Sequence, residues 1–269
     1  MLGSSRESLA SCSAALDARR QAPGFEELSA QVFAVAALLD DNAQLRSTLA
    51  DSGQPASVRE SLIRDILANQ VSAVALDTVA DVVDHRWSDD VDLVIALEQL
   101  AAQAAFTVAE GNGTLDATEE EIFRFGRAID ASAELQMALG DPARSAQTKA
   151  AIVRDLLSDR ATAATREVLE STVGRLHGQR LDGAIDTLCE LAARQRERVV
   201  AEVRVAAPLS EEQSRRLAAA LSSLKGRTVR LNVAVDPAVL GGVMVTIGDE
   251  VIDGTVASRL EQARRAVLG

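Results

Sequence analysis

The sequence predicts a mainly α-helical protein, in which a duplicated N-terminal helical bundle is followed by a small α/β C-terminal domain. Three observations lead to this fold class. Residues 1–198 repeat apolar side chains at helical spacing, residues 199–269 alternate them as strands do, and the helical part resembles itself after a shift of 90 residues. Of the 269 residues, 47% are hydrophobic and 25% charged, which is typical of a folded chain.

Two helix starts in the first part can be predicted from their capping patterns. Ser57 with Glu60, and Thr118 with Glu121, match the capping box, in which a hydroxyl and a carboxylate three residues apart satisfy the first backbone amides of a helix. The acidic run 119–121 would then lie in a first helical turn, where carboxylates favour the helix dipole. We therefore interpret this run as structural rather than catalytic.

The helical part contains an internal repeat. Residues 32–92 align with residues 122–182 without a gap, and 13 identities share this register. The identical pairs are Phe33/Phe123, Asp40/Asp130, Ala43/Ala133, Leu45/Leu135, Leu49/Leu139, Asp51/Asp141, Ala56/Ala146, Arg64/Arg154, Asp65/Asp155, Leu67/Leu157, Ala73/Ala163, Val83/Val173 and Asp92/Asp182. A period this long suits a duplicated helical domain rather than a solenoid.

The repeat register divides the helical part into two copies. We expect copy one at residues 1–113 and copy two at residues 114–198. The segment 89–110 is the longest predicted helix, and Gly111-Asn112-Gly113 ends it. In the repeat register this helix serves both as the last helix of copy one and as the first of copy two.

The tail, residues 199–269, predicts a β-α-β-β-α domain. Ser210 and Gln213 form a capping box for the helix between the first two strands. Gly241 and Gly242 are expected to allow a tight backbone passage between strands, because no Gly-Lys-Ser/Thr follows them as it would in a phosphate loop. The remaining predicted boundaries are a hairpin turn at Gly248-Asp249 and a helix start at Thr255.

Charge and composition exclude several classes of partner. The chain has 28 basic and 40 acidic residues, and the excess of acid lies in residues 1–192, whereas residues 193–269 carry 12 basic and 9 acidic side chains. Aromatic residues are only 2%, so stacking platforms for nucleic acid are not expected. The longest uncharged runs have 12 residues, short of a membrane span, and the first residues lack the features of a signal peptide. We expect a soluble chain without nucleic-acid binding or membrane insertion.

Reactive residues give no catalytic pattern. Two cysteines and two histidines cannot form a closed zinc site at ordinary spacing, and no Ser-His-Asp or Cys-His set is supported. His85 and His177 lie at nearly equivalent places in the two copies, where helix-end or interface histidines are common. We predict no metal and no cofactor, and the residues alone favour a binding or scaffold protein over an enzyme.

The tail also carries an ordered set of motifs that resembles a known family. These segments are similar to the delta subunit of the bacterial ATP synthase, the counterpart of the mitochondrial oligomycin-sensitivity-conferring protein. They are residues 206–213, Val229–Asn232, Val235–Val243, Ile247–Val256 and Arg259-Leu260. The family-motif positions expected to be structural are Asp236, Pro237, Gly241, Gly242, Asp253 and Gly254. Phe123–Arg127 and Arg86-Trp87-Ser88 resemble the long actinobacterial form, whose helical domain is duplicated.

The resemblance implies a non-catalytic stator subunit. Such a subunit ties the catalytic head to the peripheral stalk, so that proton-driven rotation is coupled to ATP synthesis on the cytoplasmic face of the membrane. Its implied partners are the N-termini of the alpha subunits, subunit b of the stalk and the neighbouring beta subunits.

In the family the helical domain receives the alpha N-termini in a groove between its first and fifth helices. Mapped onto copy two, the apolar contacts would be Ile95, Ala102, Phe106, Val168, Leu169 and Thr172. Residues 9–16 and 74–83 would play the same part in copy one. Two alternatives stay open: a free-standing helical adaptor that does not join ATP synthase, and an enzyme whose site is assembled across domains.

Overall fold

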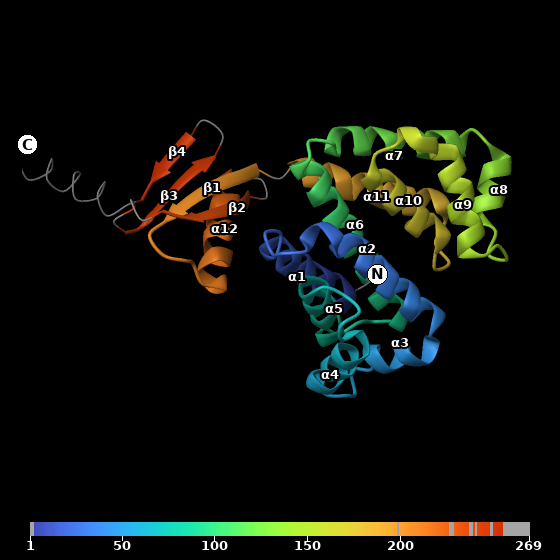
Figure 1. Cartoon of the computed structure of the whole chain (residues 1–269), viewed down its shortest axis with the longest axis horizontal. Helices are drawn as coiled ribbons and strands as arrows, with labels where there is room; N and C mark the ends of the chain where they lie inside the picture. The colour runs from blue at the N-terminus through green and yellow to red at the C-terminus, as the bar shows by residue number, and fades with distance from the viewer. Residues whose placement is uncertain are drawn as a thin grey trace, which may run out of the picture. The chain divides into compact units, whose positions relative to one another are not determined.

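In the computed structural model, the chain forms two compact units, a helical unit from Met1 to Arg196 and a small α/β unit from Glu197 to Gly269 (Figure 1). The structure describes residues 3–197, 199–225, 229–236, 239, 241–247 and 250–254. Each unit has its own hydrophobic core. The predicted fold class, mainly α with a small α/β domain at the C-terminal end, is confirmed.

The helices of the helical unit repeat at the spacing that the sequence predicts. The first six are α1 Ser4–Ala18, α2 Phe25–Asp41, α3 Ala43–Ala50, α4 Ala56–Leu67, α5 Ala73–Asp84 and α6 Asp90–Gly111. They are followed by α7 Leu115–Asp130, α8 Ala133–Gly140, α9 Ala146–Leu157, a short 3-10 turn Ser158–Arg160, α10 Ala163–Gly174 and α11 Leu181–Glu197. Helices α3, α4 and α5 each begin and end 90 residues before α8, α9 and α10.

Hydrogen bonds between helices repeat in the same register. The side chain of Gln31 accepts a hydrogen bond of 2.8 Å from the backbone N–H of Ser72, which connects α2 to the start of α5. The Glu121 carboxylate accepts one of 2.9 Å from the backbone N–H of Thr162, which connects α7 to the start of α10. The two copies therefore use the same device to fix the position of the fifth helix of the bundle.

Helix α6 belongs to both copies. It packs against α1, α2, α3 and α5, which precede it in the sequence, and against α7 and α10, which follow it. Residues 100–106 of this helix are all buried, although a helix with one apolar face would expose about half of them. Figure 1 shows α6 running from the group of α1–α5 to the group of α7–α11. Shifted by 90 residues, α1 falls within α6, so α6 is the sixth helix of copy one and the first of copy two.

The same helix is apolar enough to resemble a membrane span. Among the described residues, α6 alone has the length and composition to cross a bilayer, but 72% of its most apolar window is buried inside the structure. Core helices of folded proteins share this composition. Its neighbours in the bundle account for its hydrophobicity.

Two of the predicted helix starts are wrong. Helix α4 begins at Ala56 directly after Pro55, so Ser57 lies inside the helix and makes no cap. Helix α7 begins at Leu115, one turn before the predicted start. Thr118 is consequently buried inside the helix, where its hydroxyl donates to the carbonyl of Thr114 at 3.0 Å. The acidic run 119–121 therefore lies in the second turn of α7 rather than the first.

The small unit contains a mixed four-stranded sheet and one described helix. Its elements are β1 Val199–Val205, α12 Glu211–Lys225, β2 Val229–Val235, β3 Val243–Ile247 and β4 Glu250–Asp253. The strand order is β2-β1-β3-β4, with β1 parallel to β2 and antiparallel to β3, and β3 antiparallel to β4. Ala201, Val203 and Val205 of β1 are buried with Leu221 of α12, so one face of the sheet packs in the core.

The capping box at the start of α12 is confirmed. The backbone N–H of Gln213 donates to the Ser210 hydroxyl at 3.2 Å, and the backbone N–H of Ser210 donates to the Gln213 side chain at 2.8 Å. This reciprocal pair satisfies two backbone donors that a helix start otherwise leaves open. The helix thus begins where the crossover between the parallel strands β1 and β2 requires it.

The described family-motif residues of the tail lie at or next to the ends of its strands. Gly241 and Gly242 have φ angles of +136° and +85°, which residues with a Cβ rarely adopt. The N–H of Gly254 donates to the carbonyl of Val243 at 2.9 Å, and a Cβ on Gly254 would lie 3.1 Å from that oxygen. The N–H of Asp236 donates to Val205 at 2.9 Å, directly after β2, and Asp253 pairs with Met244 across β3 and β4. Pro237, Gly248, Asp249 and the helix predicted from Thr255 lie outside the described residues.

A buried arginine holds copy one together. The side chain of Arg59 on α4 is buried, and its guanidinium donates to backbone carbonyls at the end of α3 and at the end of α5. The acceptors are the carbonyl oxygens of Leu49, Val83, Asp84 and His85. Carbonyls at helix ends lack intrahelical partners, so one cation satisfies two helix termini.

Replacing this arginine should weaken the fold. We expect Arg59→Met to lower the free energy of unfolding by about 3 kcal/mol, because it leaves buried carbonyls without donors. Arg59→Lys should lose less, since copy two has a buried lysine, Lys149, at the equivalent position. Urea denaturation followed by circular dichroism measures the loss. Arg64→Met, which removes an ion pair with Glu60 and Asp77 that solvent reaches, is the control, with an expected loss of under about 1 kcal/mol. Equal losses for the two methionine variants would contradict the assignment.

A candidate helix-binding groove at the junction of the two copies

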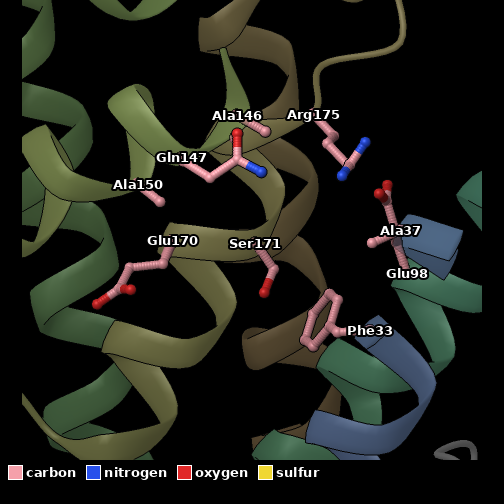
Figure 2. Close-up of a pocket in the computed structure, with 10 residues that line it drawn as sticks. Phe33, Ala37, Glu98, Ala146, Gln147, Ala150, Glu170, Ser171 and Arg175 are labelled. Carbon is pink, nitrogen blue, oxygen red and sulfur yellow. The ribbon is translucent and has the colours of Figure 1, made fainter. Parts of the chain in front are cut away.

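A groove opens where copy one meets copy two. It has a volume of about 180 Å³ and lies between α2 and α6 on one side and α9 and α10 on the other (Figure 2). Its lining residues are Phe33, Ala37, Glu98, Ala146, Gln147, Ala150, Glu170, Ser171, Gly174 and Arg175. In Figure 2, Phe33 and Ser171 lie close together on opposite walls, with Arg175 and Glu98 at one end. The groove thus combines an apolar floor with charged groups at its ends.

Small residues make the second wall of the groove. Ala146 and Ala150 of α9 and Gly174 of α10 line it together. A Cβ on Gly174 would lie 3.4 Å from the carbonyl oxygen of Ala146, so glycine allows the two helices to approach closely. A wall of small side chains also lets a further helix approach closely, because few atoms stand between the two backbones.

Arg175 ties the end of α2 to copy two. Its guanidinium forms a bidentate pair with Asp41, with distances of 2.7 and 2.9 Å, and donates to Asp40 at 2.8 Å. Asp40 and Asp41 are the last residues of α2, where two carboxylates oppose the helix dipole. Arg175 offsets this repulsion and, by its hydrogen bond, holds the pKa of Asp41 below its ordinary value.

His177 forms the buried part of the same cluster. Its side chain is 4% exposed and lies between two carboxylates of copy one, with Nε2 2.8 Å from Glu98 Oε1 and Nδ1 3.3 Å from Asp40 Oδ1. Burial alone would lower the pKa of this imidazole, but the hydrogen bond and charge of Glu98, with Asp40, outweigh burial and raise it. Burial raises the pKa of Glu98, and the contact with His177 only partly opposes this.

The cluster is specific to the junction. In copy one the positions equivalent to Arg175 and His177 are His85 and Trp87. His85 is the residue that ends α5, and the buried Trp87 donates its indole N–H to the carbonyl of Val82 at 2.8 Å. In copy one the same loop completes the core of its own copy. His85 lies at a helix end and His177 at an interface, as the sequence predicts.

Four of the six predicted groove contacts lie in the core. The side chains of Ala102, Phe106, Val168 and Leu169 are all 0% exposed, so they hold α6 and α10 together and offer no surface to a partner. Ile95 and Thr172 are half-buried, and neither is among the groove-lining residues. These four predicted contacts therefore need correction, because their side chains pack inside the helical core, where α10 lies against α6, α7 and α9.

The lining that the sequence missed consists mainly of small and polar residues on the predicted helices. Glu98, Ser171 and Gly174 belong to α6 and α10, while Phe33 and Ala37 come from a helix of the other copy. A search for small residues at a spacing of three or four on the predicted helices would have found Ser171 and Gly174. The contribution of α2 has no local signal in the sequence.

The described residues contain no group of three or more His, Cys, Asp or Glu side chains arranged to hold a metal ion. Cys12 is buried, Cys189 is half-buried, and both are free thiols. The candidate site consists of the groove and the ion cluster beside it.

Comparisons with known proteins agree with one another. The family described as "ATP synthase delta (OSCP) subunit" matches residues 97–267. The ATP synthase subunit delta of Streptomyces griseus is 41% identical over 271 residues, covering 100% of both chains, and that of Streptomyces avermitilis is 42% identical, covering 98% and 97%. That of Frankia alni is 40% identical over the full length of both. The match to a chain of the Toxoplasma gondii mitochondrial ATP synthase hexamer covers 64% of this chain and 98% of that chain at 21% identity, with a TM-score of 0.28.

A helical scaffold with a groove lined by small residues is suited to holding a helix of another protein. The comparisons specify this class further: the chain belongs to the ATP synthase delta (OSCP) subunit family. It is therefore a non-catalytic, peripheral subunit of ATP synthase, a complex that sits at the membrane, and it has a stator role.

The junction should be stronger at acidic pH. A raised pKa means that His177 binds its proton more tightly in the folded chain, so its contribution is complete below the ordinary value of 6.5 and is lost as the pH rises through the higher folded value. The raised pKa of Glu98 acts in the same direction. We expect His177→Gln to lower the free energy of unfolding by about 2 kcal/mol near pH 6 and by clearly less near pH 9.

Urea denaturation at the two pH values measures this difference. In a Glu98→Gln background the effect of His177→Gln should shrink, because the principal charged partner of the imidazole is gone. A loss that is the same at both pH values and in both backgrounds would show that His177 contributes by packing alone.

Proposed function

We propose that this subunit ties the catalytic head of ATP synthase to its peripheral stalk. In this proposal the helical unit binds N-terminal segments of the alpha subunits, with the beta subunits as neighbours in the head. The small α/β unit binds the end of subunit b at the cytoplasmic face of the membrane. The chain would thereby stop the head from turning with the rotor, so that proton-driven rotation is coupled to ATP synthesis.

The groove at the junction of the copies is the observation that carries this proposal. It lies beside α6 and α10, the first and fifth helices of copy two, where the family places the alpha N-terminus. An amphipathic helix could set apolar side chains against Ala37 while its backbone approaches Ala150 and Gly174. Arg175 and Glu98 at one end offer charges of both signs, which would fix the direction of a bound helix.

The faces of α1 and α5 in copy one, residues 9–16 and 74–83, are the candidate for a second site. Its chemistry differs from that of copy two, because an ion pair between Arg19 and Asp81 joins the two helices. The equivalent residues in copy two are Ala109 and Ser171, which carry no charge. We propose that these faces and the junction groove both bind alpha N-termini. Two modest contacts on one chain would then act together through avidity.

The stalk contact is proposed for the small unit. Residues 193–269 carry 12 basic and 9 acidic side chains, in contrast to the acidic helical part. Val235 and Val251 of the sheet are 50% and 58% exposed, although strand residues of this size are usually covered. A net positive charge together with exposed valines suits an acidic amphipathic segment of a stalk subunit.

Affinity purification tests membership of the complex directly. We expect the tagged chain, recovered from gently solubilised membranes, to bring alpha, beta and b subunits with ATP hydrolysis activity in the eluate. Recovery of the chain alone, under conditions that keep the enzyme intact, would instead favour a free-standing helical adaptor.

Filling the groove should remove one binding site. We expect the full chain to bind two synthetic alpha N-terminal peptides in isothermal titration. Ala150→Trp should abolish or weaken one of these sites by at least about tenfold, which corresponds to about 1.4 kcal/mol, because the indole occupies the space of the ligand. Ala163→Trp, at an exposed position of α10 outside the groove, is the matched control. A wild-type stoichiometry of one peptide would reject the second site, and unchanged binding by Ala150→Trp would reject the groove.

A further inference from the structure

The two copies differ in what covers one phenylalanine of their second helix. Phe33 on α2 is 8% exposed, because it lies in the junction groove against copy two. Phe123, its equivalent on α7, is 57% exposed. The residue is the same and its place on the helix is the same, so the difference lies in the neighbour. No third copy follows to cover α7 as copy two covers α2.

A second hollow surrounds the exposed phenylalanine. It has a volume of about 170 Å³ and lies between α7 and α11. Its lining residues are Asp116, Glu119, Glu120, Phe123, Cys189 and Arg196. Arg196 pairs with Glu119 at 3.0 Å, and Arg124 pairs with Glu120 at 2.7 Å. Three carboxylates therefore stand beside one exposed aromatic ring.

Copy one shows what kind of element fits this face. In copy one, α10 faces Phe33 and Ala37 of α2 with the small residues Ser171 and Gly174. Glu167 of α10 lies beside Ser29 of α2. The residue of copy two that is equivalent to Ser29 is Glu119. Copy one therefore presents the Ser29 hydroxyl to the Glu167 carboxylate, whereas copy two has the Glu119 carboxylate at the same position. Arg196 and Arg124 already pair with Glu119 and Glu120, so the α7 face keeps an excess of one carboxylate, which favours an occupant with basic side chains where α10 brings an acidic one.

We propose that the face formed by α7 and α11 around Phe123 is a second docking surface, and that it binds a basic amphipathic helix of another subunit. The small apolar strip of that helix would cover Phe123, as α10 covers Phe33. Its lysine or arginine side chains would meet Asp116, Glu119 and Glu120. This surface is separate from the junction groove, and its occupation in the cell rests on the proposed assembly into ATP synthase.

A native cysteine reports on the proposed contact. Cys189 lines the hollow, whereas Cys12 is 2% exposed in the core of copy one and serves as an internal control. Alkylation by N-ethylmaleimide, followed by mass spectrometry, gives the rate at each thiol. We expect Cys189 to react at least about tenfold more slowly in purified ATP synthase than in the isolated chain, because a docked helix covers the hollow.

Substitution of Phe123 distinguishes a helix docked on this surface from unspecific burial of Cys189 in the complex. Phe123→Ser should bring the rate at Cys189 in the complex back toward that of the isolated chain. Met137→Ser, which removes a side chain on α8 that is 70% exposed, should leave the protection unchanged. If the chain co-purifies with the complex and Cys189 reacts equally fast in both states, this docking surface is rejected while the proposed function stands.

A peptide experiment decides the question without the complex. A synthetic helix of alanine, leucine and lysine with one apolar face should slow the alkylation of Cys189 in the isolated full chain, and Phe123→Ser should remove this effect. A matched peptide with glutamate in place of lysine should protect less, because it meets the three carboxylates. Equal effects of the two peptides, or no effect of either, would overturn the proposed chemistry of the partner.

Discussion

The complete burial of α6 is the constraint on which the helical unit depends. Residues 100–106 have no exposed side, since copy one packs on one face of the helix and copy two on the other. Such a helix must be apolar around its whole circumference, and its polar exceptions need partners. Gln103 is the example: it is 5% exposed, and its side-chain amide donates to the Asp17 carboxylate at 3.1 Å. The two copies are therefore halves of one core rather than two domains joined by a linker.

Once α6 is shared, the remaining surfaces of the copies have to meet, and polar chemistry decides how. The end of α2 brings Asp40 and Asp41 to the loop after α10. There Arg175 forms ion pairs with both aspartates, and His177 contacts Asp40. Beside this cluster the helices are lined by small residues, so they leave a groove instead of closing it. The ion cluster holds the end of α2 against the loop after α10, and the wall of small residues leaves the groove open beside it. Both belong to the interface between the two copies.

Much of the fold could be predicted because its signals are local. The repeat register predicted that residues 32–92 correspond to residues 122–182, and α3 to α5 recur at this spacing as α8 to α10. The change from helical to alternating periodicity after residue 198 predicted β1. The helix starts predicted at Ser57 and Thr118 were wrong, because residues that match a capping pattern can also lie inside a helix. Pro55 determines the start of α4, and Thr118 is part of a buried hydrogen-bond network with Thr162.

The site was harder to predict, since burial is a property of the whole assembly of helices. Phe106 and Val168 lie on apolar faces that suit a partner helix equally well, and only the three-dimensional packing of the helices shows that these faces are already occupied. Likewise, nothing in the local sequence distinguishes Phe33, which is covered, from Phe123, which is exposed.

The shared helix also affects how such a chain can grow or be shortened. Because α6 ends one copy and begins the next, duplication adds five helices rather than six, and the added copy is incomplete without its predecessor. A truncation at the boundary between the copies would expose the apolar face of α6 that copy two covers, and the product would be prone to aggregate. Loss of a single copy during evolution would therefore need a deletion of one whole repeat period, which restores a complete bundle, and not a simple loss of one end.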